Sequence, residues 1–297
     1  MIINQTKQFP AKIEGIDLSK PITSEQKDEI DRAMSQYGVL IFPNQVINDI
    51  ELFAFATQLG PIESASSGTH QDRKRLTNQQ INDISNLDSD GQILKANDRL
   101  RMSSLGNQLW HSDSSYKEVP AKYSMLHARV IPPMGGETEF ADMRVAWDHL
   151  PLYLKKKCVH LICDHSMMYS RAKIGFHEFS EEEKKRCTPV TQRLVRRQHE
   201  TGRLSLYLSA HIGKIHDWLV PESLIFIQEL TEFATQREFV YQHVWQVHDL
   251  VMWDNRSTMH RGKSYESLIY PRDLRRVTLE GKSSTLTDII ELKEFFS

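Results

Sequence analysis

A histidine and a carboxylate, His111 and Asp113, stand two residues apart in the stretch of residues 109–116. In an extended chain, side chains at i and i+2 point to the same face, so these two groups would converge on one point. They form two thirds of a 2-His-1-carboxylate set, which binds non-haem Fe(II) and leaves positions open for substrates. The third ligand has to be a distant histidine, and the best candidate is His260. A bare His-x-Asp pair is also frequent at protein surfaces, so the surrounding residues must decide.

Further along the chain from His260, three arginines stand at positions 272, 275 and 276. Fe(II) oxygenases need a co-substrate that supplies two electrons, commonly 2-oxoglutarate, and its distal carboxylate needs a cation such as the bidentate arginine fork. Arg272 and Arg276 are spaced i, i+4, which allows one for 2-oxoglutarate and one for an anionic substrate. For any one of these arginines taken alone, a position on the surface is the simpler interpretation.

The elements that must position these residues are short strands and amphipathic helices. A capping box at Thr23 and Gln26 begins a helix that ends before Gly38. Further helices are predicted at 48–59, 142–150, 180–186 and 221–235, and strands at 11–18, 39–42, 83–87, 123–131, 137–141, 204–208, 238–245, 249–253 and 275–279. Helices at the front and strands after residue 123 predict one α+β domain over residues 1–297. Its core would be a double-stranded β-helix (jelly roll) with flanking helices, which can bring His111 and His260 together.

The polar stretch of residues 63–95 shows no strong periodicity. One interpretation is a surface loop. The other is a lid beside the active site, because long loops in compact domains are often functional.

Composition narrows the class of protein. The chain has 297 residues, with 39% hydrophobic and 26% charged residues and a net charge of -2, so no basic field for nucleic acid or a membrane surface is expected. The first residues lack the pattern of a secretory signal, and Cys158, Cys163 and Cys187 lack metal-site or disulfide spacing. We therefore expect a cytoplasmic enzyme that acts on a small molecule.

Several segments together resemble the TauD/TfdA family of Fe(II)/2-oxoglutarate dioxygenases. They span nearly the whole chain and lie at residues 83–86, 107–115, 123–126, 135–140, 234–241, 249–256 and 260–262. The resemblance implies that His111, Asp113 and His260 bind iron. It also implies that Thr138 and Arg272 hold the distal carboxylate of 2-oxoglutarate.

The resemblance implies further roles around the iron motif. Arg276 would lie near the substrate anion or the 2-oxoglutarate C1 carboxylate. The other residues expected to contact substrate are Asn107, Ser114, Tyr116 and His211. The basic residues that hold the substrate upstream of His111 do not align, which leaves Lys95, Arg99 and Arg101 as candidates. His216 lies near the same strand end as His211 and could also face the pocket, whereas the remaining histidines are expected to be structural or exposed.

The implied reaction consumes O2 and 2-oxoglutarate at Fe(II) and hydroxylates a small carboxylate substrate, with succinate and CO2 as co-products. On an aryloxyalkanoate, hydroxylation beside the ether oxygen would release a phenol and a 2-oxo acid. Alternatives are a sulfonate or amino-acid derivative as substrate, with hydroxylation or desaturation, and a non-redox cupin-like binding protein. A halogenase is disfavoured because Asp113 is present. A homo-oligomer is expected.

Overall fold

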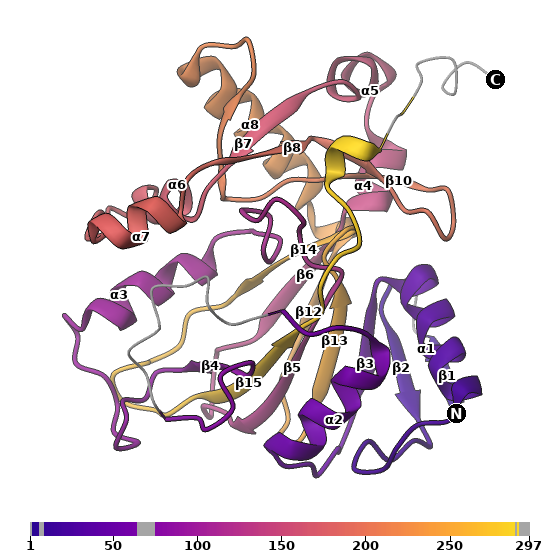
Figure 1. The fold of residues 1–297 in the computed structure, drawn as a ribbon, viewed down its shortest axis with the longest axis vertical. Coiled ribbons are helices and arrows are strands. Elements are labelled where there is room, and N and C mark those ends of the chain that lie inside the picture. Colours follow the sequence, from indigo (N-terminus) through magenta and orange to yellow (C-terminus); the bar gives the residue numbers. More distant parts are fainter. Residues whose placement is uncertain (1, 6–8, 64–74, 289, 291–297) are drawn as a thin grey trace.

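The computed structural model describes residues 2–5, 9–63, 75–288 and 290 (Figure 1). A seven-stranded sheet forms the larger layer. In spatial order it contains β1 (Ile2–Gln5), β2 (Ala11–Glu14), β3 (Val39–Phe42), β13 (Leu250–Asp254), β5 (Tyr123–Val130), β15 (Asp273–Thr278) and β4 (Asn82–Ser85). All neighbours pair antiparallel except β2 and β3. Strands from both ends of the chain thus become neighbours.

A three-stranded sheet lies against one face of the larger sheet. It contains β12 (Val240–His243), β6 (Thr138–Asp142) and β14 (Thr258–Gly262). Phe140 of β6 packs against Val251 and Trp253 of β13 in the space between the two sheets. The predicted strands at 238–245 and 249–253 are therefore present and joined by a short loop, but they belong to different sheets.

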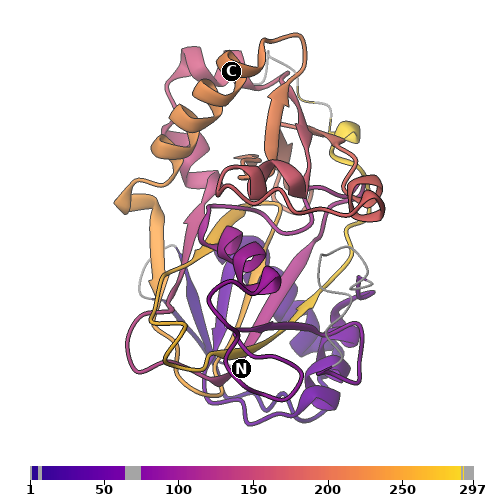
Figure 2. The same cartoon turned by 90° about the vertical axis from the view of Figure 1, so that its left-hand side faces the viewer.

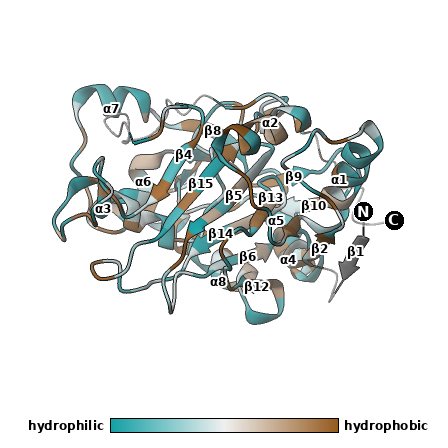
Figure 3. Ribbon diagram, turned by 90° about the horizontal axis from the view of Figure 1, so that it is seen from below, coloured by the Kyte–Doolittle hydropathy of each residue, from teal (hydrophilic) through white to brown (hydrophobic). Residues whose placement is uncertain are grey.

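Helices cover the opposite face of the larger sheet. Leu250 and Met252 of β13 pack there with residues of α1 (Ser24–Tyr37) and α2 (Asp49–Leu59). Strand β13 is therefore buried on both faces, which explains its continuous apolar sequence. The predicted α+β jelly roll with flanking helices is confirmed. Figure 3 shows hydrophobic residues on the central strands and hydrophilic residues along α7 (Glu181–Arg186).

Local sequence signals locate several boundaries well. The capping box of Thr23 and Gln26 begins α1, and Gly38 ends it in the left-handed conformation at φ 70°. Helix α2 has the predicted bounds within one residue, but its buried face contains Phe55, whereas Phe53 is only half-buried. The strand predicted at 11–18 ends at Glu14.

A third group of elements lies between β6 and β12 in the sequence and packs as a separate core beside the jelly roll (Figure 2). Its strands are β7 (Ile162–His165), β8 (Val190–Arg193), β9 (Val195–Arg197), β10 (Leu204–Leu206) and β11 (Ile212–Ile215). Its other helices are α4 (Met143–His149), α5 (Leu152–Cys158), α6 (Met167–Ala172) and α8 (Val220–Ala234). The sequence did not predict most of these short strands. In the part of the chain that the structure describes, no helix is both long and apolar enough to cross a membrane.

Candidate metal centre and its cavity

Backbone pairing brings His111 and His260 together. Each residue's N–H donates to the carbonyl of the other, at 3.0 and 2.9 Å, which forms an isolated antiparallel bridge between the iron motif and β14. Their ring centroids lie 4.2 Å apart. The Trp253 ring packs against the His260 ring, with the two centroids 4.6 Å apart.

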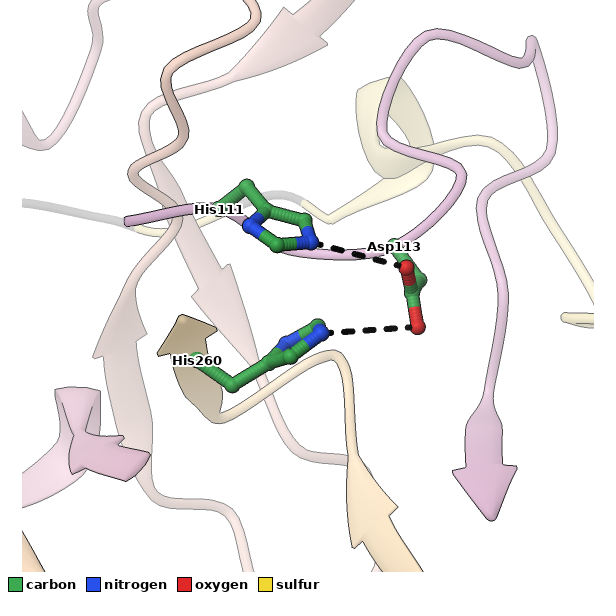
Figure 4. Close-up of side chains that lie close together, drawn as sticks. All are labelled: His111, Asp113 and His260. Atoms are coloured by element: carbon green, nitrogen blue, oxygen red, sulfur yellow. Dashed lines mark ion pairs between the residues drawn. The ribbon is translucent and has the colours of Figure 1, made fainter. Parts of the chain in front are cut away.

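Asp113 completes the cluster, although not on an extended strand. The bridge covers His111 only, and the chain enters a turn at Asp113 before Ser114, whose φ is 56°. The carboxylate still converges on the histidines, with Oδ1 3.9 Å from His111 Nε2 and Oδ2 3.8 Å from His260 Nε2 (Figure 4). The expected convergence is thus present, but a turn produces it.

The protonation states of this cluster suit a divalent metal. His111 Nδ1 donates to the Leu109 carbonyl at 2.7 Å, so Nε2 keeps its lone pair. Burial lowers the pKa of both His111 and His260, which keeps the imidazoles neutral. Burial opposes ionisation of Asp113, but the Arg276 charge and the hydrogen bond from Ser124 favour the carboxylate, and its pKa is lowered to about 2. Two neutral imidazoles and one carboxylate are the donor set that binds non-haem Fe(II).

Residues that the sequence interpretation missed hold the Asp113 carboxylate. Ser124 Oγ on β5 donates to Asp113 Oδ2 at 2.8 Å. Asn255 Nδ2 donates to Ser124 Oγ at 2.9 Å, and Asn255 Oδ1 accepts from the Asp113 N–H at 3.2 Å. Such outer contacts orient metal ligands. The available signal for Asn255 in the sequence was its position directly after β13 and shortly before β14, the strand that contains His260.

Arg276 also contacts Asp113. Its Nη1 donates to Asp113 Oδ1 at 2.8 Å, which neutralises this guanidinium in the structure. The arginine predicted to meet a substrate or co-substrate anion is therefore already paired with a candidate metal ligand.

The cluster opens into a cavity of about 1060 Å³, counting its mouth. His111 and His260 line it together with Asn107, Thr138, Arg272 and Arg276, so it gathers most of the predicted site residues. Thr138 Oγ1 accepts a hydrogen bond from Trp245 at 3.0 Å, which fixes the threonine side chain. Among the described residues, no carboxylate pairs with Arg272.

Three predicted substrate residues lie beside the iron motif and are not among the described residues that line this cavity. Ser114 Oγ donates to Glu63 Oε2 at 2.7 Å. The His211 ring is buried 5.9 Å from His111 and 4.9 Å from Tyr116. Burial raises the pKa of Tyr116 to about 12, so its phenol stays protonated.

The basic candidates upstream of the motif differ in position. Arg101 lines the cavity and donates to Ser267 Oγ at 3.3 Å. Arg99 pairs with Glu183 at 2.6 Å, and Lys95 is exposed. Residues 64–74, which include part of the predicted lid or loop, lie outside the described residues. Arg75, just after them, pairs with Asp83 and Asp273.

A jelly roll with two histidines and one carboxylate at the mouth of its barrel defines the class of non-haem metal oxygenases. The comparisons with known proteins agree. The family model described as taurine catabolism dioxygenase TauD, TfdA family, matches residues 3–278. The chain belongs to the TauD/TfdA family.

Individual relatives are similar over almost the full chain. The alpha-ketoglutarate-dependent 2,4-dichlorophenoxyacetate dioxygenase of Cupriavidus pinatubonensis is 41% identical over 91% of this chain and 94% of its own. The (S)-phenoxypropionate/alpha-ketoglutarate-dioxygenase of Sphingobium herbicidovorans is 33% identical, with 87% of each chain covered. The crystal structure of AAD-2 in complex with Mn(II) and N-oxalylglycine has a TM-score of 0.93 at 48% identity, covering 96% of this chain and 99% of that one.

Proposed function

We propose that this chain is an Fe(II)- and 2-oxoglutarate-dependent dioxygenase that cleaves aryloxyalkanoates. The observation that carries the proposal is that the cluster of His111, Asp113 and His260 opens, through its two histidines, into a cavity that Arg272 also lines. The relatives named for 2,4-dichlorophenoxyacetate and phenoxypropionate support the substrate class. We further propose that residues 1–297 form a single domain.

Each side chain has a role in this proposal. His111, Asp113 and His260 would hold the metal, with Ser124 and Asn255 orienting the carboxylate. When bound, Fe(II) supplies a site at which O2 is activated as 2-oxoglutarate loses CO2. Arg272 and Thr138 would bind the distal carboxylate of 2-oxoglutarate and so orient its other end toward the metal. Arg276 would steady Asp113 beside the C1 carboxylate or the substrate anion.

The overall chemistry is balanced for an aryloxyacetate. One aryloxyacetate, one 2-oxoglutarate and one O2 give a phenol, glyoxylate, succinate and CO2. One oxygen atom enters the methylene C–H bond beside the ether and gives a hemiacetal. The bond between this carbon and the ether oxygen then breaks, the new hydroxyl loses its proton to become the aldehyde of glyoxylate, and the ether oxygen gains a proton to become the phenol. The apolar residues of the cavity, among them Leu94, Leu105 and Leu126, suit an aromatic ring and exclude water from the reacting carbon.

The remaining parts of the proposal concern the context of the enzyme. We propose a cytoplasmic location, supported by three cysteines that are free and buried. We also propose a homo-oligomer, supported by large exposed apolar residues such as Leu219 and Ile225 on and beside α8 and Tyr153 on α5.

Two measurements test the proposal. Anaerobic addition of Fe(II) and 2-oxoglutarate should produce the weak visible charge-transfer band of a chelated complex. Phenoxyacetate and O2 should then release phenol, glyoxylate and succinate in equal amounts. Absence of the band in folded protein would refute the dioxygenase assignment and favour a non-redox binding protein. A band with succinate release only from sulfonates or amino-acid derivatives would instead correct the substrate class.

A further inference from the structure

Arg171 on α6 is a buried guanidinium without a carboxylate partner. It is 4% exposed, and its hydrogen bonds go to neutral oxygens: Ser170 Oγ at 3.1 Å, Asn107 Oδ1 at 3.3 Å and Ser103 Oγ at 3.5 Å. Within the described part of the chain, no aspartate or glutamate forms an ion pair with it. A buried charge without a counter-charge is unfavourable, so such an arginine points to an anion that arrives with a ligand.

A glycine leaves space for the guanidinium of Arg171. Gly106, in the 3-10 helix η1 (Leu105–Gln108), lies directly against the guanidinium. A Cβ at Gly106 would lie 2.6 Å from Nη1 and 2.8 Å from Cζ of Arg171, too close for any other residue in this arrangement. The backbone of Gly106 has no positive φ, so the close approach of Arg171 accounts for the glycine.

Arg171 lies close to the candidate metal centre. Its partner Asn107 lines the same cavity as His111 and His260.

Three arginines line the cavity, Arg101, Arg272 and Arg276, and Arg171 lies behind the part of its wall that Asn107 forms. Arg276 is already neutralised by Asp113 at 2.8 Å. Arg272 packs against Gly136, beside β6 and Thr138, where the distal carboxylate of 2-oxoglutarate is proposed to bind. Arg101 and Arg171 both donate to neutral oxygens, but Arg101 is only partly buried, whereas the charge of Arg171 is buried and uncompensated. The structure therefore favours Arg171 as the counter-charge for the carboxylate of the second organic acid, the substrate.

Asn107 connects this charge to the cavity. A guanidinium can only donate hydrogen bonds, so the Asn107 atom that faces Arg171 must be the oxygen. The amide nitrogen then points away from Arg171 and carries two N–H donors. Among the described residues, no protein group accepts a hydrogen bond from it.

We propose that Asn107 and Arg171 form the subsite that binds the carboxylate of the substrate, an assignment that rests on the proposed function. Asn107 Nδ2 donates to the carboxylate. Arg171 is a positioning residue that holds the amide in this orientation and supplies the compensating positive charge. The subsite makes the enzyme select acids over neutral aryl ethers of the same shape.

The first test compares phenoxyacetate with phenoxyacetamide, its neutral analogue. Binding is followed by calorimetry and by the shift of the charge-transfer band on protein loaded anaerobically with Fe(II) and 2-oxoglutarate.

Arg171→Met should weaken phenoxyacetate binding by about 10- to 100-fold, because a charge-assisted interaction is lost. Amide binding should change by less than about 3-fold, and Arg171→Lys should restore part of the preference. KM for phenoxyacetate should rise more than kcat falls. Arg101→Met, at a cation that lines the cavity itself, is the matched control and should keep the preference for phenoxyacetate over the amide.

The second test uses Asn107→Asp, which places a carboxylate against Arg171. Because the buried guanidinium gains its counter-charge, the melting temperature without ligands should rise by about 2 °C or more. The same carboxylate should repel phenoxyacetate and abolish its binding, while the amide still binds. If Arg171 had a purely structural role, Asn107→Asp would raise the melting temperature but would not abolish phenoxyacetate binding.

The outcomes separate the subsite from the proposed function. If the wild-type protein bound neither phenoxyacetate nor a longer phenoxyalkanoate, the substrate class and the subsite would both be wrong. If it preferred phenoxyacetate to the amide, and Arg171→Met and Asn107→Asp kept that preference, the substrate class would stand and the subsite would be refuted. Loss of the preference in Arg101→Met alone would move the subsite to Arg101.

Discussion

His111 and His260 lie directly opposite each other and exchange both backbone hydrogen bonds, at 3.0 and 2.9 Å. The pairing joins a loop that precedes β5 to strand β14, near the end of the jelly roll. It fixes both Cα positions through backbone groups, so the two imidazoles face one point whatever their side chains bind. A side-chain substitution at either position should therefore change the metal site without removing the pairing that builds it.

Metal affinity gives the first prediction. His260→Ala should weaken Fe(II) binding by roughly 100-fold or more, because loss of a direct ligand exceeds the 10- to 100-fold effect typical of an outer contact. Anaerobic metal titration measures this directly. His211→Ala is the control, since its ring lies 5.9 Å from His111 outside the cluster, and it should bind Fe(II) as the wild type does. If both variants bound Fe(II) as tightly as the wild type, His260 would not be a ligand.

The co-substrate arginine gives the second prediction. Arg272→Met should weaken 2-oxoglutarate binding by about 10- to 100-fold, because a charge-assisted bidentate contact is removed. Fe(II) affinity should stay the same, since Arg272 has no contact with the metal cluster. Titration of the charge-transfer band with 2-oxoglutarate measures the first quantity. An unchanged 2-oxoglutarate affinity would place its distal carboxylate elsewhere in the cavity.

A pair of glycines gives the third prediction. Gly136 has φ +72°, and a Cβ there would lie 3.3 Å from Arg272 Nε, whereas Gly91 has φ +78° with nothing within 4 Å. Both Gly136→Ala and Gly91→Ala should lower the free energy of unfolding by about 1 kcal/mol, because of the left-handed backbone. Only Gly136→Ala should also weaken 2-oxoglutarate binding, by displacing Arg272. Chemical denaturation and co-substrate titration measure the two effects, and equal binding by both variants would contradict the placement of Arg272.

Acid sensitivity gives the fourth prediction. His165 on β7 is fully buried, stacks on Tyr207 at 5.8 Å, and has no hydrogen-bond partner at either ring nitrogen among the described residues. Burial, with a smaller effect of the Lys173 charge, lowers its pKa from 6.5 to about 3. Below pH 6.5 the unfolded chain binds a proton that the folded chain does not. Neutral His165 therefore makes its full contribution to the free energy of unfolding above pH 6.5, and this contribution is lost as the pH falls toward 3.

The size of this effect can be measured by substitution. Between pH 7 and pH 5 the wild-type protein should lose about 2 kcal/mol of unfolding free energy through His165. His165→Leu should remove that part of the pH dependence and be at least as stable at pH 5. Urea unfolding at the two pH values measures the difference between the two proteins. Parallel losses in both would assign the acid sensitivity to other groups.

Local sequence patterns were sufficient for the elements whose signals lie within a few residues. The capping box at Thr23, the left-handed Gly38 and the apolar run of β3 each satisfy backbone or burial requirements locally. The His-x-Asp spacing of the motif, together with a later histidine, named the candidate donor set, and the resemblance to the TauD/TfdA family favoured it over a pair of surface residues. The short strands β7, β8 and β11 were missed because they are held by pairing with distant partners and have little periodicity of their own. Strand β9 pairs with the nearby β10, but its three residues are too few to show a period.

The sequence by itself determined which groups are available for chemistry and the class of fold that holds them. The tertiary structure alone decided how these groups are paired. It shows Asp113 turned toward the histidines by a loop, Arg276 neutralised by Asp113, and Arg171 buried without a counter-charge beside Asn107. Charge compensation and hydrogen-bond satisfaction depend on distances between residues far apart in the chain. Spacing along the sequence does not contain those distances, because they arise only when the sheets and the helices around them pack together.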